Sequence, residues 1–483
     1  MTIITLLDLL VNALIEAEGN FLNNPKDFHS LEKAVKASAD AFAAGFLGEV
    51  LSGINERICS CSWREGRYNI QRNDKRTLIS SVGDISFDCT YFRRLNEEGG
   101  YTYLLEDLIG LEHHERFTEE AEVLLLTEAL KTSYSEATRI LPSRQKITRT
   151  TVMNKVYRLA EEMPCEEPKE IKKVKYLYVE ADEDHIAEQH GKQSADNANF
   201  ISKLVYVYEG KQDVSGYANR KELKGSFYFS GVYPGSEGNE KLWKNVQDYI
   251  DGNYDMEYLE RIFVSGDGAA WIKSGADYLE KALFCTDKYH LMKYINQAAT
   301  QIPDKKDEVK KELWHLLYSK KRKAKERFAA YTGQMLLKAK NPDKVEALRT
   351  YVLENWGAVR RTLKNKLVQG CSAESHVSHV LSDRLSSSPM GWSQRGADRM
   401  SKLRCYERNP GSEGIINLVR YSREQRKLLS TGTEDVMGKD LTLREITAEH
   451  YNQYRSYIDR MQAHILGLTV KKTASIRTQL RLL

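Results

Sequence analysis

Three acidic residues, Asp182, Asp267 and Glu374, stand where the sequence predicts that a strand ends or a helix begins. The segments around them follow the order strand-strand-strand-helix-strand-helix-strand-helix. In-line displacement at a phosphodiester uses two divalent cations about 3.5–4 Å apart, and converging carboxylate oxygens hold such cations. The three acids therefore predict a metal-dependent site that cuts nucleic acid.

The segment that carries the first two acids has the pattern of a sheet. Strands are predicted at VKYLYVEAD (174–182), FISKLVYVYEG (200–210), GSFYFSGVY (225–233), RIFVSGD (261–267) and ALFCTD (282–287), with helices before and after the fourth. A strand that follows a crossover helix can lie parallel to the first strand and next to it, so that Asp182 and Asp267 become neighbours. Asp184 shares a strand face with Asp182 and competes with it for the first position.

Two further residues follow the last predicted strand. Asp287 and His290 can reach the same sheet edge, and the neighbouring Lys288 and Lys293 favour a phosphate-contacting or hydrogen-bonding role for His290. The alternatives are purely structural roles, in which His290 packs in the protein interior and Asp267 caps the following helix.

Only helices are predicted between residues 294 and 366, where Asn341-Pro342 supplies an N-cap and a first-turn proline. This helical segment separates the last strand from Glu374, which shares a helix with apolar residues on adjacent turns. A basic run within it is either a solvated helix face or a contact to the DNA backbone, and it comprises Lys320, Lys321, Arg322 and Lys323.

The N-terminal part has a different pattern of predicted elements. Residues 1–60 are helical in pattern, residues 61–116 contain a hairpin over 76–95 around a Gly83-Asp84 turn, and residues 117–163 predict short helices about a break at Pro142-Ser143. The last pair suits a helix-turn-helix, although any small helical bundle gives a similar pattern. In a helix-turn-helix, four residues would face the major groove: Thr148, Arg149, Thr151 and Asn154.

Composition bounds the class of protein. The chain has 483 residues, of which 41% are apolar and 29% charged, and a net charge of +4, which fits two or three globular domains. No stretch of eighteen apolar residues occurs, and the first residues form an amphipathic pattern, so we expect a cytoplasmic protein. Residues 164–173 read as a linker, and residues 406–483 as a helical, basic C-terminal region.

Other chemistries find less support. The seven cysteines form no paired CxxC pattern, and the phosphate-loop, dinucleotide and nucleophile-elbow motifs are absent. A histidine-rich zinc hydrolase is a weaker alternative because HExxH is missing; its ligands would come from His185, His190, His376 and His379.

The runs VEADEDHI, FVSGDGAAWIK, DKYHLMKYI and SAESHVSHVLSDRL, with SSPMGWS and GADRMSKLR, resemble bacterial insertion-sequence transposases of the ISLre type. These belong with the Mutator-like DDE transposases. The resemblance implies a mixed α+β and α/β fold: an RNase H-like core over 174–293 and 367–405, interrupted by the all-helical insertion 294–366. It maps Asp182, Asp267 and Glu374 onto the DDE triad, and Asp287 and His290 onto an Asp/Cys-x-x-His signature.

The same resemblance implies cofactors and partners. It implies two Mg²⁺ or Mn²⁺ ions per site, double-stranded DNA as terminal repeats and target, and a homodimer or larger assembly on DNA in the bacterial nucleoid. Two alternatives remain: an RNase H-like nuclease or resolvase that cuts without joining, and a domesticated DNA-binding regulator.

Overall fold

The computed structural model describes residues 3–95, 99–112, 114–164, 170–189, 199–214, 221–388, 390–409 and 414–431. Cys165, His190, part of the predicted linker and residues 432–483 of the predicted basic region lie outside them. The chain forms two compact units, one from residues 1–124, 141–146 and the chain from 423 on, the other from 125–140 and 147–422. No helix in the described part of the chain is long and apolar enough to cross a membrane.

The first unit contains a helical hairpin and a β-hairpin. Helix α1 (Ile3–Asn23) packs against α2 (Phe28–Ser60), and α2 also packs against β2 (Gly83–Arg94). Strand β1 (Tyr68–Ser80) pairs antiparallel with β2, which also pairs with β3 (Tyr101–Thr102). The short helices η1 (Ser62–Arg64) and α3 (Leu104–Leu108) complete this part.

The predicted hairpin is present, but the predicted turn was wrong by two residues. Ser80 pairs with Gly83, so the turn is formed by Ser81 and Val82. The Ser80 hydroxyl donates to the Gly83 carbonyl oxygen at 2.7 Å and accepts from the Val82 N–H at 3.2 Å, which closes the chain earlier. Gly83 has φ of +120°, a conformation that a glycine adopts easily.

Helices α5 (Tyr134–Ala137) and α6 (Arg149–Tyr157) follow α4 (Glu119–Ala129). Thr148 caps α6, because its hydroxyl accepts a hydrogen bond from the Thr151 N–H at 3.2 Å. Residues 138–148 separate α5 from α6, which is longer than the tight turn of a helix-turn-helix.

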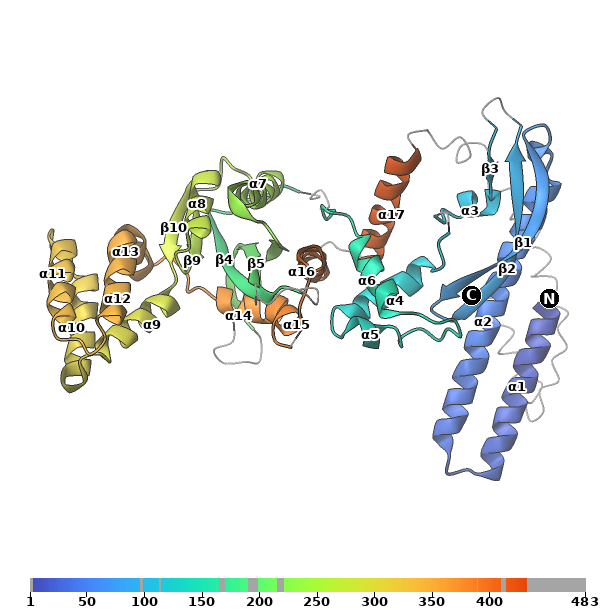
Figure 1. The fold of residues 1–483 in the computed structure, drawn as a ribbon, viewed down its shortest axis with the longest axis horizontal. Helices are drawn as coiled ribbons and strands as arrows, with labels where there is room; N and C mark the ends of the chain where they lie inside the picture. Colours follow the sequence, from blue (N-terminus) through green and yellow to red (C-terminus); the bar gives the residue numbers. More distant parts are fainter. Residues whose placement is uncertain are drawn as a thin grey trace. The chain divides into compact units, whose positions relative to one another are not determined.

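The second unit is built on a five-stranded mixed sheet with the order β10-β9-β4-β5-β8 (Figure 1). Strand β9 lies parallel to β4 and next to it, as predicted, and β10 lies parallel to β9, whereas β5 runs antiparallel to both of its neighbours. A small hairpin of β6 and β7 was not predicted. The bounds are β4 Tyr176–Ala187, β5 Asn199–Tyr208, β6 Gly210–Asp213, β7 Lys221–Lys224, β8 Phe227–Gly231, β9 Arg261–Gly266 and β10 Ala282–Thr286.

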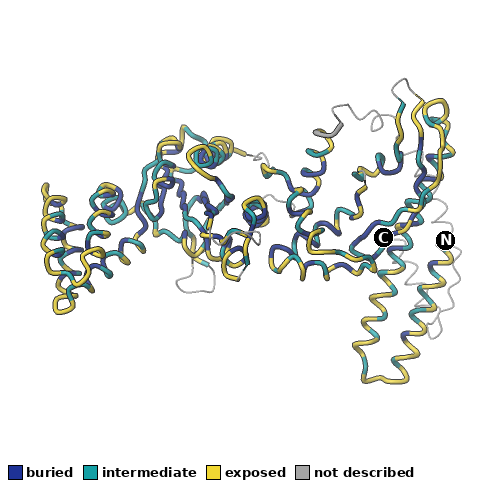
Figure 2. The backbone as a smooth tube through the Cα atoms, viewed as in Figure 1, coloured by how far each residue is buried: buried dark blue, intermediate teal, exposed yellow. Residues whose placement is uncertain are grey.

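Alternation along the strands gives the sheet two different faces. On one face, Val179 and Ala181 of β4 share a buried core with α7 (Gly235–Asn253) and α8 (Ala270–Tyr278), including Trp243. The strands of this core are buried along most of their length (Figure 2). The opposite face of β4 packs against α14 (Ala373–Val377), while α16 (Gln394–Arg408) packs on β5 and β8.

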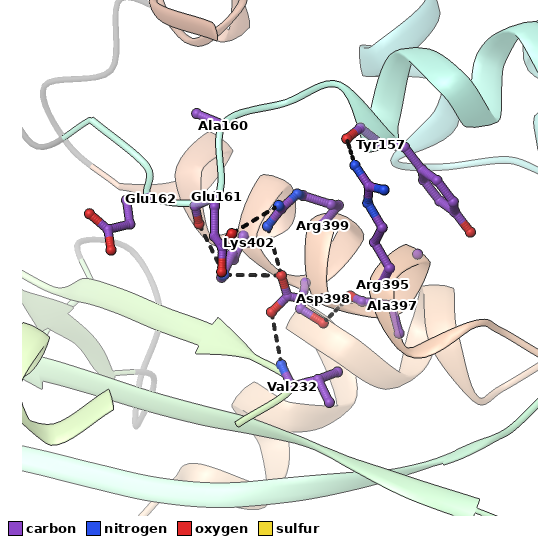
Figure 3. Close-up of polar contacts among 12 residues, drawn as sticks. Tyr157, Ala160, Glu161, Glu162, Val232, Arg395, Ala397, Asp398, Arg399 and Lys402 are labelled. Carbon is purple, nitrogen blue, oxygen red and sulfur yellow. Dashed lines mark hydrogen bonds and ion pairs between the residues drawn. The ribbon is translucent and has the colours of Figure 1, made fainter. Parts of the chain in front are cut away.

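Between α14 and α16 lie a π-helical turn, η3 (Ser378–Ser382), and α15 (Asp383–Leu385). Asp398 of α16 accepts from the Val232 N–H at 3.0 Å, just beyond β8, and from Lys402 at 3.0 Å (Figure 3). Lys402 also donates to the carbonyl oxygen of Glu161 at 3.0 Å. These contacts fasten α16 to the end of β8 and to the segment that follows α6. Helix α17 (Ile415–Thr431) is the last element of the described residues.

The insertion between β10 and α14 is helical, as predicted, but it is broken into more pieces. Its core is shared by α9 (Lys288–Ala299), α10 (Lys306–Tyr318), α11 (Ala324–Leu336), α12 (Pro342–Glu354) and α13 (Trp356–Lys364), with η2 (Pro303–Lys305) between the first two. Helix α13 is tied to the sheet, because Arg361 donates to the Phe284 carbonyl oxygen of β10 at 2.9 and 2.7 Å.

Candidate active site

The register of the parallel strands aligns three acidic residues. Glu180 of β4 pairs with Ser265 of β9, so Asp182 and Asp267 stand at corresponding positions two residues farther on. Thr286 of β10 pairs with Gly266, which gives Asp287 the position beside Asp267. Because side chains alternate along a strand, all three point to the sheet face that carries α14. We call Asp182, Asp267 and Asp287 the acid row.

Asp182 lies inside β4, not at the end of a strand as predicted. Strand β4 stays paired with β5 as far as Ala187, whereas its pairing with β9 stops at Glu180. The acid row therefore begins where the parallel part of the sheet stops. The prediction was wrong because the antiparallel hairpin with β5 extends β4 beyond the segment that the apolar pattern marks.

The acid row is electrostatically strained. Burial raises the pKa of the Asp182 carboxyl to about 6, and the nearby negative charge of Asp267 adds to the rise. The Glu183 N–H, which donates to Asp182 Oδ1 at 2.9 Å, and the neighbouring His290 oppose it. Asp267 directly follows β9, and its Oδ1 accepts from the Ala269 N–H at 2.8 Å. Asp267 therefore also stabilises the start of α8. Two acids this close favour a cation between them.

His290 adds a nitrogen group to the same edge. Asp287 caps α9 by accepting from the Tyr289 N–H at 2.9 Å, and its other oxygen lies 2.9 Å from His290 Nδ1. This hydrogen bond raises the pKa of His290, and the charges of Asp287, Asp267 and Asp182 contribute in the same direction. His290 therefore keeps its proton to a higher pH than a free histidine does.

Asp184 lies apart from this group. Its carboxylate accepts from the Ser386 hydroxyl at 3.0 and 2.9 Å, near the end of α15, and burial raises its pKa. It stands one step farther along β4 on the same face as Asp182, where β9 no longer runs beside it. The geometry thus groups Asp182 with Asp267 and gives Asp184 a different partner.

Glu374 is exposed near the start of α14, on the face of the sheet that bears the acid row. The start of α14 lies against β4, because the Ser372 N–H donates to Glu180 at 2.6 Å. Burial raises the pKa of the neighbouring Cys371 well above its usual range, and the charges of Glu180 and Asp287 add to the rise. Within the part of the chain that is described, however, no three acidic, histidine or cysteine side chains are close enough to hold a metal ion. Neither the acid row with His290 nor the acid row with Glu374 therefore forms such a group in this structure.

One residue of this face was missed by the sequence argument. Glu180 is 1% exposed, and it accepts hydrogen bonds from Tyr208 at 2.6 Å, from Tyr206, and from the Ser372 N–H at 2.6 Å. The available signal was an acid two residues before Asp182 in an otherwise apolar strand, a place where an unpaired charge is costly.

The residues predicted to contact DNA lie on the surface of the second unit. Thr148, Arg149 and Asn154 of α6 are exposed, and Thr151 is half-buried. The four residues of the basic run are exposed and form the break between α10 and α11, not a helix face: Lys320, Lys321, Arg322 and Lys323. Two more cations join them, since Arg360 and Lys364 both donate to the Ser319 carbonyl oxygen at 3.0 Å.

The histidines of the zinc alternative do not converge in the described part of the chain. His376 lies 3.1 Å from the Tyr228 hydroxyl through Nδ1 and against the Tyr206 ring, and burial lowers its pKa. His379 is 3.6 Å from Asp383, while His185 is 3.7 Å from Glu183 on the other face of β4.

Known proteins similar to this chain point to one family. Residues 21–421 match the uncharacterised protein family UPF0236. One UPF0236 protein of Caldanaerobacter subterraneus subsp. tengcongensis is 32% identical over 412 residues, which cover 83% of this chain and 84% of that protein. A second from the same organism is 32% identical over 393 residues, covering 81% of this chain and 80% of that protein.

Among solved structures, the Drosophila P element transposase strand transfer complex matches at 12% identity with a TM-score of 0.20, covering 76% of this chain and 92% of that chain. The match to the family spans most of the sequence, including the acid row, His290 and Glu374. This chain belongs to the UPF0236 family.

Proposed function

We propose that this protein is a DDE transposase, which cuts DNA at the ends of an insertion sequence and joins those ends to target DNA. The observation that carries the proposal is the acid row, in which strand register aligns Asp182 with Asp267 at the edge of a mixed sheet. Carboxylates at such an edge suit the divalent cations that phosphodiester chemistry uses.

The topology of the sheet supports the proposal. Three antiparallel strands in a meander, followed by two parallel strands on the far side of the first, give the order β10-β9-β4-β5-β8. This is the arrangement expected of an RNase H-like core. The helical insertion enters after β10 and ends before α14, between the acid row and the proposed third acid.

The relatives supply a separate line of support. The names of three UPF0236 proteins of Caldanaerobacter subterraneus subsp. tengcongensis combine four, two and eleven locus designations. Several genes for one protein in a single genome are what a self-copying element produces. Together with the motifs that resemble ISLre-type transposases, this favours a mobile element over a nuclease with a housekeeping role.

The residues of the edge fit divalent cations. Asp182 and Asp267 offer hard oxygen ligands, and their mutual repulsion is relieved by a cation. We infer that these two residues and Glu374 would hold two Mg²⁺ or Mn²⁺ ions. Such ions favour deprotonation of the attacking group and offset the charge on the leaving oxygen.

The protein's own groups would position the DNA. Water attacks phosphorus and the bond to the 3′ oxygen breaks, which leaves a 3′-hydroxyl at the element end. This hydroxyl then attacks a phosphorus of the target and loses its proton, while the bond from that phosphorus to the target's own 3′ oxygen breaks and the released oxygen takes up a proton. His290, whose pKa is raised by its hydrogen bond with Asp287, can donate a hydrogen bond to a phosphate oxygen when it is protonated. The exposed face of α6, with Arg149, would contact the terminal repeats, and the basic run would contact the DNA backbone.

The decisive experiment incubates purified protein with a plasmid that carries candidate element ends and either Mg²⁺ or Mn²⁺. We expect cleavage and strand joining by the natural protein and neither by Asp267→Asn. Asp277→Asn, which alters an exposed acid on α8, is the matched control and should be active. Cleavage without joining would favour the nuclease alternative, and specific binding without cleavage would favour the regulator.

A further inference from the structure

Glu180 is a buried acid that no step of the proposed reaction uses. It sits on β4, two residues before Asp182 and on the same face of the strand, so the Cα atoms of the two residues are about 7 Å apart. Its side chain is almost fully enclosed, with 1% of the residue exposed. A charge in such a place is strongly destabilising unless donors surround it.

The donors around Glu180 come from two strands and from the segment before α14. Tyr208 donates to Oε1 at 2.6 Å, and Tyr206 donates to Oε2, both from β5. Ser372 contributes its backbone N–H at 2.6 Å and its hydroxyl at 3.1 Å, both to Oε2. Lys211 of β6 lies 3.6 Å from Oε1 and donates to the Gly370 carbonyl oxygen.

Ser372 immediately precedes α14 and lies two residues before Glu374. Helix α14 runs without a break into η3 and α15, but no side chain caps its start, so the first N–H groups of this helical segment need partners from outside it. The contact with Glu180 therefore fixes this end of the helix on β4. A charge-assisted hydrogen bond to a backbone N–H is both short and directional, which suits it to this task.

We propose that Glu180 is a positioning residue for Glu374: its carboxylate anchors the start of α14 to β4 and so sets where Glu374 stands relative to the acid row. This inference rests on the proposed function, because it takes Glu374 as the third metal-holding acid. It assigns the buried acid of β4 to alignment of the site and the exposed acid of α14 to the chemistry.

The test replaces Mg²⁺ by Fe²⁺ in the full-length protein and adds ascorbate and hydrogen peroxide. Hydroxyl radicals then cut the backbone near the bound iron, and mass spectrometry locates the cuts. For the natural protein we expect cuts around residues 182, 267 and 374. In Glu180→Gln the cuts around 374 should weaken several-fold relative to those around 267.

The matched control is Asp398→Asn, which removes another mostly buried carboxylate that ties a helix to a strand end of the same unit (Figure 3). Asp398 holds α16 to the end of β8, so the ratio of cuts at 374 and 267 should stay unchanged. If Glu180→Gln does not fold, Ser372→Ala removes only the hydroxyl contact and should lower the ratio less.

An unchanged ratio in the Glu180 or Ser372 variant that folds, or an equal fall in Asp398→Asn, would overturn the inference. Cuts around 182 and 267 in the natural protein with none around 374 would also overturn the inference. That result would still support metal binding at the acid row. Absence of any iron-dependent cut in the natural protein would count against the proposed function itself. With DNA, Glu180→Gln should lower kcat by about 10–100-fold while binding to the ends is unchanged.

Discussion

The acid row and α14 present carboxylates to the same face of one sheet, but they are held in different ways. Asp182, Asp267 and Asp287 take their positions from strand register, which many backbone hydrogen bonds maintain. Glu374 takes its position from the first turn of the helical segment formed by α14, η3 and α15, whose start is anchored by Glu180. One part of the site is therefore stiff and partly buried, while the other is exposed and depends on a small number of contacts.

The difference separates two requirements of a metal site. A stiff row of acids creates the negative field that attracts a cation. The same charges lower the free energy of unfolding, because the pKa of Asp182 is raised in the folded state. The exposed acid Glu374 lowers the stability of the fold little, and its position depends on the contact between Glu180 and Ser372. Substitutions in the two parts should therefore differ in their effects on activity and on stability.

The largest expected effect is the loss of cleavage in Asp267→Asn, by about 1,000-fold or more, because Asp267 is the central member of the acid row. The amide keeps the size of the side chain and can still accept from the Ala269 N–H, so the fold should persist. End-labelled DNA in a gel assay measures the rate. Activity within tenfold of the natural protein, with Asp277→Asn also active, would remove Asp267 from the site.

Next in size, Glu374→Gln should lower cleavage by about 100-fold and leave the melting temperature unchanged, because the side chain is exposed. The assay is the same, with thermal unfolding measured in parallel. Asp383→Asn, an exposed acid on α15, serves as the control and should remain active. If the two variants behave alike, the comparison between the acid row and α14 fails.

In the opposite direction, Asp182→Asn should stabilise the metal-free protein. The carboxyl of Asp182 has a pKa of about 6 in the folded chain, above its ordinary value, so the folded state loses stability as the pH rises from about 4 to about 6. Removal of this charge should raise the free energy of unfolding at pH 7 by up to about 3 kcal/mol. Urea denaturation at pH 7 and pH 4 measures it, and the gain should disappear at pH 4.

The smallest expected effect concerns His290. Its hydrogen bond to Asp287 raises its pKa, so this contact contributes stability at pH 6 that is lost as the pH rises through the pKa of the folded state. NMR titration should place the pKa of His290 above 6.5 and that of the buried His376 below it. In Asp287→Asn the value for His290 should fall, and an unchanged value would assign the shift to the other acids.

Much of the framework could be predicted because it depends on local pattern. The five strands of the main sheet and the crossover between β4 and β9 follow from apolar runs of strand length and from the preference for short, right-handed connections. The position of Asp267 after a buried strand was visible for the same reason. The hairpin turn and the break at 319–323 were harder, because a serine hydroxyl and cations gathered at one carbonyl decide them.

Local pattern in the sequence was enough to predict the five strands of the main sheet and the helical insertion, and to select Asp267, Asp287 and Glu374 as acids next to the ends of these elements. The alignment of Asp182, Asp267 and Asp287 in one row is a property of the folded chain, since register depends on pairing between strands far apart in the sequence. The tertiary structure also separated Asp184 from that row and gave Glu180 its partner Ser372, 192 residues away. Such partners leave no local periodicity, because hydrogen bonds between distant segments are selected by the packed fold as a whole.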